Sequence, residues 1–189
     1  MSNNNNIKIV TIGNGEVGKT TMLHCFTTNK FSEQYIPTAF DNYATNITVR
    51  NKVVSLQLWD TAGQIEYDQF RPLSYSNTDI FLVCFCVVDR GSFADVKKKW
   101  VPEINKTMGK DRLYIIIGTK SDLRDSTERV DQVTPEEAKA LCKEIGGIKY
   151  IECSSKSGLN IKDIFVDAAS EVLDNRSNKK LQQKKCVIQ

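Results

Sequence analysis

The chain carries Gly13-Asn14-Gly15-Glu16-Val17-Gly18-Lys19-Thr20 between an apolar segment at 7–12 and a helical pattern near 19–27. This spacing fits the pattern G-x-x-x-x-G-K-[ST]. The glycines allow a tight turn whose N–H groups converge on one anion, and the helix N-terminus adds a favourable field. A glycine-rich turn with an exposed lysine is the alternative, but the flanking strand and helix favour a P-loop that binds phosphate.

The side chains of this loop have separate expected roles. Lys19 supplies a point charge to the outer phosphates, and the Thr20 hydroxyl is expected to bind Mg²⁺. A carboxylate at Glu16 would repel phosphate at close range. We hypothesise that Glu16 weakens the retention of nucleotide or Mg²⁺ and speeds spontaneous exchange. The residues of this segment expected beside the nucleotide are Gly13, Gly15, Glu16, Val17, Gly18, Lys19, Thr20 and Thr21.

Strand and helix patterns alternate along the rest of the chain. Continuous apolar runs at 80–88 and 113–118 predict central parallel strands, and alternation on both sides of 50–52 predicts an antiparallel hairpin at a sheet edge. Helices are expected at 93–104, kinked or shortened by a proline, after a capping box that begins at Thr134, and at 161–172. The expected fold is α/β, of the P-loop NTPase type: a doubly wound, mostly parallel six-stranded sheet with one antiparallel edge hairpin and helices on both faces.

Asp60-Thr61-Ala62-Gly63-Gln64 follows the strand expected at 53–59. P-loop proteins place a carboxylate at such a strand end, and Asp60 is expected to hold Mg²⁺ through water. Taken alone, Asp60 fits a strand-ending turn equally well. Gly63 can bring its N–H against a γ-phosphate, and Gln64 can hold the attacking water. We therefore expect Gln64, Lys19 and Gly63 to be the catalytic residues.

A base-binding segment is predicted at Thr119-Lys120-Ser121-Asp122, after the run at 113–118. The Asp122 carboxylate can accept hydrogen bonds from N1–H and the 2-amino group of guanine, whereas adenine would leave it unpaired and desolvated. Lys120 can lay its stem along the base plane. After the strand expected at 149–153, Ser154, Ser155 and Lys156 can present backbone N–H groups to guanine O6. The two segments together predict a preference for GTP and GDP.

Length and composition limit the domain organisation and the classes of partner. The 189 residues suit one domain, expected at 7–175 between a disordered lead at 1–6 and a tail at 176–189. No signal peptide is recognised, and the cysteines are expected to be reduced and, at Cys84 and Cys86, buried in the core. The five basic residues of 176–189 exceed the whole net charge of +3. The tail is therefore expected to meet an anionic surface, and no nucleic acid is expected as a partner.

Nearly the whole chain resembles the Ras superfamily of GTPases, and its switch segments resemble Rac-type members of the Rho family. The stretches that carry the resemblance are Tyr35-Ile36-Pro37-Thr38-Ala39-Phe40-Asp41-Asn42-Tyr43, Leu58–Gln64 with Arg71–Tyr75, Lys99–Glu103, and Thr119–Asp125. The chain departs from Rho proteins in three places. A helical insert is not recognised between Asp125 and Thr134, the base loop reads Ser-Ser-Lys, and Glu16 stands where the family has small residues. Partners that use the insert are therefore in question.

The resemblance implies further residue roles. Thr38 would bind Mg²⁺ and sense the γ-phosphate, Tyr35 would lie beside the nucleotide, Phe31 would pack on the guanine, and Trp59 would help to select the exchange factor. The effector region would be Tyr35–Tyr43. A loop hydroxyl at Thr38, a surface hydrophobe at Phe31 and a sheet residue at Trp59 are the plain alternatives.

The resemblance also implies a monomeric molecular switch with regulatory partners. These are exchange factors, GTPase-activating proteins, a dissociation inhibitor and effectors of the Rac-binding type, in signalling to the actin cytoskeleton. No arginine lies between Lys30 and Val49, so an arginine finger in cis is not expected there, and unaided hydrolysis should be slow. We expect Thr20→Asn to trap an inactive form and Gln64→Leu a GTP-loaded one.

The last residues, Cys186-Val187-Ile188-Gln189, fit the C-a-a-X prenylation motif. Terminal Gln favours a farnesyl group, although Rho relatives more often carry geranylgeranyl. A single prenyl group binds weakly, and four nearby lysines supply the second signal. The expected location is cytoplasmic, on the inner face of a membrane, with the tail disordered. A scaffold without turnover, a P-loop ATPase or kinase, and a constitutive membrane adaptor are the alternatives.

Overall fold

The computed structural model describes residues 5–31, 40–126, 130 and 132–186. Their element order is β1 (Asn6–Gly13), α1 (Lys19–Thr28), β2 (Phe40–Val49), β3 (Lys52–Thr61), η1 (Ile65–Tyr67), η2 (Arg71–Tyr75), β4 (Ile80–Cys86), α2 (Arg90–Asp95), η3 (Val96–Trp100), α3 (Val101–Met108), β5 (Tyr114–Thr119), η4 (Ser121–Ser126), α4 (Pro135–Glu144), β6 (Lys149–Glu152) and α5 (Ile161–Cys186). The alternation of strands and helices predicted from the sequence is confirmed.

Within the described residues the strands form one six-stranded sheet in the order β2-β3-β1-β4-β5-β6. β2 and β3 pair antiparallel, and every other neighbouring pair is parallel. The chain runs from β1 to β3 on one side and then crosses to β4 on the other, so its direction reverses at β1. Ligands of open α/β sheets bind beyond the carboxyl ends of the strands at such a reversal. The fold therefore places the loop after β1 at the expected binding edge.

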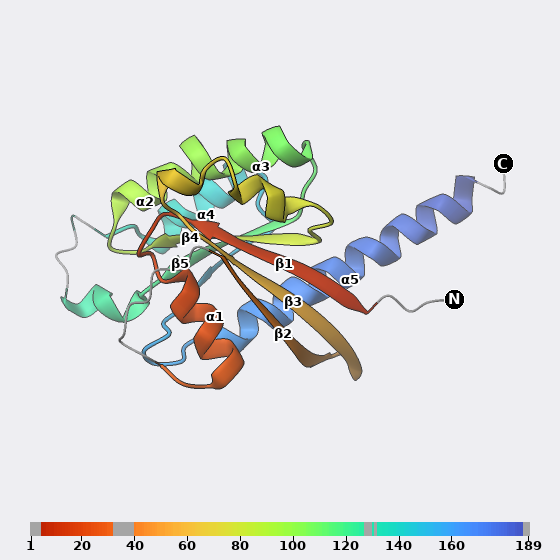
Figure 1. Ribbon diagram of the computed structural model, residues 1–189, viewed down its shortest axis with the longest axis horizontal. Helices are drawn as coiled ribbons and strands as arrows, with labels where there is room; N and C mark the ends of the chain where they lie inside the picture. The colour runs from red at the N-terminus through yellow and green to blue at the C-terminus, as the bar shows by residue number, and fades with distance from the viewer. Residues whose placement is uncertain (1–4, 32–39, 127–129, 131, 187–189) are drawn as a thin grey trace.

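Two helical layers cover the sheet, as Figure 1 shows. α1 and α5 pack on one face, where Phe26 stacks on Phe165 with ring centroids 3.8 Å apart. The η3–α3 segment and α4 pack on the other, around the fully buried Trp100. Alternate residues of β1 feed the two cores, which is why the central strands are apolar along their whole length. The predicted doubly wound architecture is confirmed.

Helix boundaries follow local chemistry. Thr134 caps α4, and its hydroxyl accepts from the N–H of Glu137 while the Glu137 carboxylate accepts from the N–H of Thr134. Pro102 lies in the first turn of α3, and the turn before it is π-helical, at η3. Proline offers no N–H to the preceding turn, which explains why the helical stretch expected at 93–104, which runs from Arg90 to Met108, changes to π-helix before Pro102.

Two predicted boundaries need correction. The lead expected at 1–6 is already structured at its end, because β1 begins at Asn6 and the carbonyl of Asn5 accepts from Ser55 N at 3.0 Å. The tail expected to be disordered from residue 176 is helical through Cys186. Its lysine, glutamine and leucine residues favour helix, and no glycine or proline interrupts α5. Arg176 belongs to the folded body, since it donates to Asn6 O at 2.9 Å.

The burial predicted for Cys84 and Cys86 is confirmed. In the described part of the chain Cys25, Cys84, Cys86, Cys142 and Cys153 are free thiols and all are buried. Burial raises the pKa of the Cys153 thiol to about 12, which keeps it protonated at neutral pH. None of the helices in the described ranges is long and apolar enough to cross a membrane.

Candidate nucleotide-binding site

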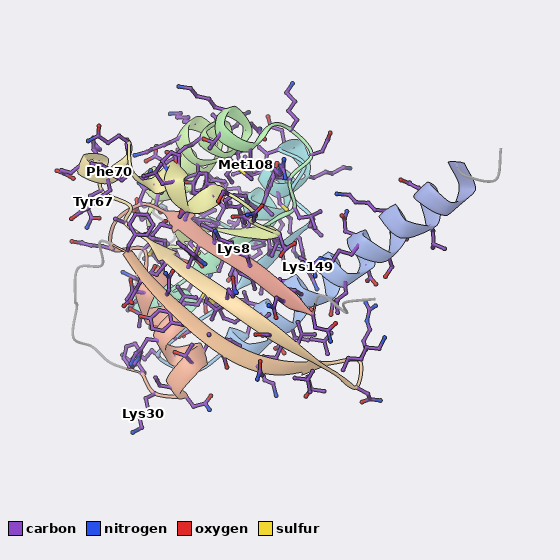
Figure 2. The ribbon with its side chains drawn as sticks, turned by 45° about the vertical axis from the view of Figure 1, so that its right-hand side comes forward. Lys8, Lys30, Tyr67, Phe70, Met108 and Lys149 are labelled. Atoms are coloured by element: carbon purple, nitrogen blue, oxygen red, sulfur yellow. The ribbon has the colours of Figure 1, made fainter. Side chains whose placement is uncertain are left out.

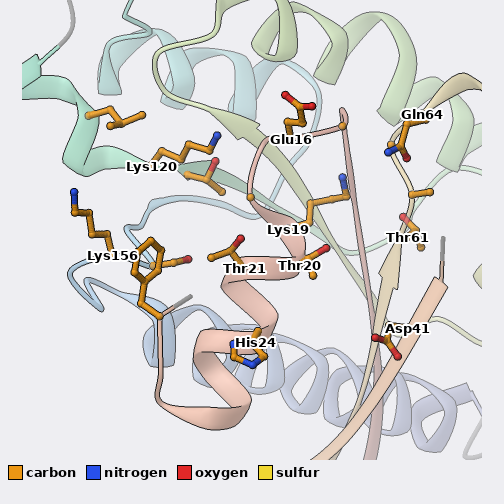
Figure 3. A pocket seen from close by; sticks show the side chains of 18 of the residues that line it. Glu16, Lys19, Thr20, Thr21, His24, Asp41, Thr61, Gln64, Lys120 and Lys156 are labelled. Atoms are coloured by element: carbon orange, nitrogen blue, oxygen red, sulfur yellow. The ribbon is translucent and has the colours of Figure 1, made fainter. Parts of the chain in front are cut away.

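A cavity of about 920 Å³ lies at the carboxyl edge of the sheet. Its walls come from the loop after β1, the start of α1, the start of β2, the end of β3, and the loops after β5 and β6. Figure 3 shows Lys120 and Lys156 at one end and Gln64 and Thr61 at the other, with the first turn of α1 between them. We call these the base end and the phosphate end.

Lys19 is held at the phosphate end. Its ammonium donates to the carbonyls of Gly13 and Asn14, at 2.9 and 2.7 Å, and the residue is only 6% exposed. Burial lowers the pKa of Lys19 to about 8, and the nearby Asp60 carboxylate partly offsets this shift. Gly13 adopts a φ of +146°, and a Cβ there would lie 2.2 Å from the Cys84 carbonyl oxygen. Only glycine fits this position, which explains the first glycine of the motif.

Thr20 and Asp60 meet beside Lys19. The Thr20 hydroxyl donates to Asp60 Oδ2 at 2.5 Å, and the Asp60 residue is fully buried. A hydroxyl and a carboxylate give the oxygen donors that Mg²⁺ prefers, and Mg²⁺ is commonly held by one or two carboxylates with substrate phosphates completing its shell. The two residues present therefore fit the expected ion. The third predicted ligand, Thr38, lies outside the described residues.

The segment after β3 packs against the P-loop. A Cβ on Gly63 would lie 2.3 Å from both Asn14 C and Gly15 N, so no other residue fits without displacing backbone. The Gln64 side chain lies beside the same loop, with its Cγ 3.8 Å from the point that a Cβ on Gly15 would occupy. Among the described residues no group hydrogen-bonds to Gln64 Oε1, although this atom is buried. Gly63 and Gln64, two of the three catalytic residues predicted from the sequence, thus adjoin the phosphate loop.

The base end joins two loops that leave adjacent strands. Ser154 donates its hydroxyl to Asp122 Oδ1 at 2.5 Å, and Ser121 N donates to the Cys153 carbonyl at 3.1 Å. The Thr119 hydroxyl lies within hydrogen-bonding distance of Val17 O, at 2.5 Å, and so ties β5 to the P-loop. The Lys120 stem passes near Gly18, with Cε 3.7 Å from the Cβ position of that glycine.

The structure changes the expected role of Ser154. Its backbone N–H donates to the Leu159 carbonyl at 3.2 Å, so it is engaged within the loop. The side chain instead holds the Asp122 carboxylate in place. Of the three residues predicted to present N–H groups to a base oxygen, Ser155 and Lys156 line the cavity, and Ser154 lies behind them.

Most of the predicted nucleotide-binding residues line this one cavity, together with the predicted catalytic residue Gln64: Gly15, Glu16, Gly18, Lys19, Thr20, Thr21, Phe31, Gly63, Thr119, Lys120, Asp122, Ser155 and Lys156. Gly13, Val17, Asp60 and Ser154 lie behind that lining and support it. Of the predicted effector region, Asp41 and Tyr43 reach the cavity, Phe40 and Asn42 are exposed on β2, and Tyr35, Ile36, Pro37, Thr38 and Ala39 lie outside the described residues.

Four lining residues were not predicted from the sequence: His24, Thr61, Ala62 and Leu123. His24 follows Thr20 by one helical turn, so the i, i+4 spacing on α1 was a usable signal. Thr61 and Ala62 lie between residues that were predicted. Leu123 follows Asp122 in the turn η4 (Ser121–Ser126) and offered no chemical signal of its own.

Glu16 stands at the rim of the cavity. It is exposed and adopts a left-handed φ of +62°. In the view of Figure 3 its carboxylate points away from Thr20 and Thr21. Water screens an exposed charge, so its repulsion of a bound phosphate is weaker than its place in the sequence implies.

Comparison with known protein families agrees with this geometry. The family model for the Ras family matches residues 8–174, a range that includes the P-loop, the segment after β3 and both base loops.

Proposed function

This chain belongs to the Ras family of small GTPases, and from that premise we propose that it is a Rac-like switch that binds GDP or GTP with Mg²⁺ and hydrolyses GTP slowly. The observation that carries the proposal is that Asp122 and the P-loop line opposite ends of one cavity. A carboxylate at the opposite end of the cavity from the phosphate loop would select guanine. Guanine offers N1–H and the 2-amino group as a pair of donors, and adenine has no matching pair.

Four side chains of the phosphate end and the P-loop backbone would act in hydrolysis. P-loop N–H groups and the Lys19 ammonium would bind the transferring phosphoryl group, and Gln64 would orient the water that attacks it. Thr20 and Asp60 would hold Mg²⁺, which when bound neutralises charge on phosphate oxygens. Little covalent chemistry is required of the protein, so positioning and electrostatics dominate the rate.

Slow unaided turnover is part of the proposal. None of the described residues that line the cavity is an arginine. An arginine supplied by a GTPase-activating protein would raise the rate by roughly a thousandfold or more. The long-lived GTP state then suits signalling, because γ-phosphate contacts order the switch segments until hydrolysis releases them.

Exposed apolar side chains support a partner surface beside the cavity. Ile65, Phe70 and Leu73 are 77%, 49% and 76% exposed, and Figure 2 shows Phe70 and Tyr67 projecting from the segment after β3. Exposed apolar residues grouped in this way mark interaction sites. We assign this surface, together with β2, to effectors of the Rac-binding type and to exchange factors, and the downstream process to actin signalling.

The tail carries the proposed membrane attachment. A prenyl group on Cys186 with the lysines at 179, 180, 184 and 185 would give the two signals that stable binding needs. Mass spectrometry of the protein from its native cells would detect the prenyl group. Flotation with anionic vesicles should retain the native protein and lose Cys186→Ser, and equal flotation of both would reject the anchor.

Nucleotide content is the decisive test of the switch. The purified protein is saturated with Mg²⁺ and denatured, and the released nucleotide is identified. Stoichiometric GDP supports guanine selectivity and completed hydrolysis. ATP, or competition by ATP as strong as by GTP, would overturn the role given to Asp122. In a binding assay with a Rac-binding effector domain, Gln64→Leu should bind and Thr20→Asn should not, and equal binding by both would reject the switch.

A further inference from the structure

Two loops of the phosphate end are fastened to the same helical segment. The first is the P-loop, through Asn14. The Asn14 amide group donates to Asp95 Oδ2 at 2.7 Å, and its carbonyl oxygen accepts from the Trp100 indole N–H at 2.7 Å. The backbone carbonyl of Asn14 also accepts from Lys19 at 2.7 Å. The residue that helps to hold the catalytic lysine is therefore anchored by both ends of its side chain to 95–100.

The second loop is the Ala62–Gln64 segment, which is fastened through Arg71. This guanidinium is fully buried and donates to the carbonyls of Ala62 and Gln64, at 2.8 and 3.2 Å. Glu103 of α3 accepts from its third nitrogen at 2.9 Å, and Asp68 accepts at 2.6 Å. A buried cation is tolerated only with such complete pairing. The arrangement is a built support for the carbonyl of Gln64.

Trp100 joins the two fastenings. Its ring is fully buried, its N–H points to Asn14, and the Arg71 guanidinium carbon lies 4.7 Å from the ring centroid. Gly63 completes a closed set of contacts among Asn14, Trp100, Arg71 and the Ala62–Gln64 segment, because its backbone lies against Asn14 and Gly15. We call this set of contacts the circuit. Asn14 occupies a variable position of the P-loop pattern, and Trp100 and Arg71 lie outside every nucleotide-binding motif in the chain. Their contacts with the two loops arise only in the fold.

We propose that Asn14, Trp100 and Arg71 are positioning residues for GTP hydrolysis, which hold the P-loop and the Ala62–Gln64 segment in one register through η3 and α3. The inference rests on the proposed function and deepens it. Hydrolysis needs the water held by Gln64 and the phosphoryl group held by the P-loop within a few tenths of an ångström of their productive places. Two loops fixed to one rigid body meet that demand, and neither of these fastenings contacts the base end.

The first test uses matched tryptophan variants. Trp100→Phe removes the indole N–H but keeps a ring for Arg71, whereas Trp59→Phe makes the same change on β3, away from the circuit. The rate of single-turnover GTP hydrolysis should fall about tenfold in Trp100→Phe, the effect of one buried hydrogen bond. GDP affinity should stay near that of Trp59→Phe, and the melting temperature should fall only as far as the smaller buried ring accounts for. Unchanged hydrolysis, or a loss matched by equal losses of affinity and stability, would overturn the proposal.

A double-mutant cycle tests the coupling itself. Asn14→Ala cuts the P-loop fastening, and Arg71→Lys keeps the charge but loses the planar fork. The double variant should hydrolyse GTP little more slowly than the slower single variant, because both changes break one circuit. Multiplicative losses would show two independent supports and reject the coupling. If Arg71→Lys does not fold, Glu103→Gln replaces it, since it weakens the same guanidinium from α3.

A spectroscopic readout separates positioning from simple stability. In Trp59→Phe, Trp100 is the remaining tryptophan of the two in the chain. Its emission should change when GDP is replaced by a non-hydrolysable GTP analogue, and Asn14→Ala should abolish that change. A constant emission in both nucleotide states would contradict the inference. A wild-type protein that binds no guanine nucleotide would instead reject the proposed function, so the two failures are distinguishable.

Discussion

The two ends of the cavity are held together by different kinds of structure. At the base end, Asp122 and Ser154 follow the neighbouring parallel strands β5 and β6, so strand pairing alone brings them within 2.5 Å. At the phosphate end, Asn14 reaches Trp100 across 86 residues of sequence, and the register depends on side chains of η3 and α3. In the proposed function, selectivity for the base therefore rests on strand pairing in the sheet, whereas the catalytic geometry rests on the contacts made by η3 and α3.

The largest effect is expected on nucleotide affinity, from a variant that alters only the base end. Asp122→Asn replaces the carboxylate that should accept two donors from guanine, and we expect GDP affinity to fall about a thousandfold. The asparagine amide would instead match the 2-oxo group of xanthine, so XTP should compete with GTP. Hydrolysis at saturating nucleotide should stay within about threefold of wild type. Affinities by isothermal titration check this.

The matched control is Asp125→Asn, an exposed carboxylate in the same turn. It should leave both affinity and base preference unchanged. A large loss of the hydrolysis rate in Asp122→Asn would mean that the two ends are not separate.

The next largest effect is expected on the hydrolysis rate, from a variant that alters only the phosphate end. Gly63→Ala puts a Cβ 2.3 Å from the Asn14 and Gly15 backbone, so the segment must move away from the P-loop. Single-turnover hydrolysis should fall about a hundredfold, as when one preorganised donor is lost. The preference for GTP over ATP should not change. Wild-type hydrolysis in this variant would contradict the close packing of Gly63.

A smaller loss of GDP affinity is expected when Asp122 loses its support at the base end. Ser154→Ala removes the hydroxyl that holds Asp122, and one such hydrogen bond to a charged group contributes about 1.5 kcal/mol. GDP affinity should therefore fall about tenfold, with base preference retained. Ser157→Ala, in the same loop, is the control and should bind GDP normally. Fluorescence titration measures both, and equal affinities would show that Asp122 does not need this support.

The smallest effect concerns Glu16. Because its carboxylate is exposed and screened, Glu16→Ala should slow GDP release only about threefold, and the difference should shrink at high salt. Release of a fluorescent GDP analogue measures the rate, with Glu66→Ala as an exposed control that does not line the cavity. An unchanged release rate would reject the idea that Glu16 speeds exchange.

Features formed by contiguous residues could be predicted from the sequence. The P-loop, the buried strand β4 and the capping box at Thr134 are local patterns, and each was found where expected. The support of Asn14 by Trp100 could not be predicted, because a pairing between distant side chains leaves no spacing to read. The tail was misjudged for another reason: polar lysines and glutamines are typical of solvated coil, but they are also good helix formers that continue an existing helix.

The position of α5 has a consequence for synthesis on the ribosome. This helix comes last in the element order, yet it covers one face of the sheet, and Arg176 bonds to Asn6 across 170 residues. Translation proceeds at about 5–20 residues per second. Several seconds therefore pass between the synthesis of β1 and β3 and the synthesis of α5, which packs on their apolar face. In that interval the part of this face that α5 covers in the complete fold stays exposed to solvent. Chaperone capture, or a pause before residue 161, should therefore influence the yield of this protein more than its final stability does.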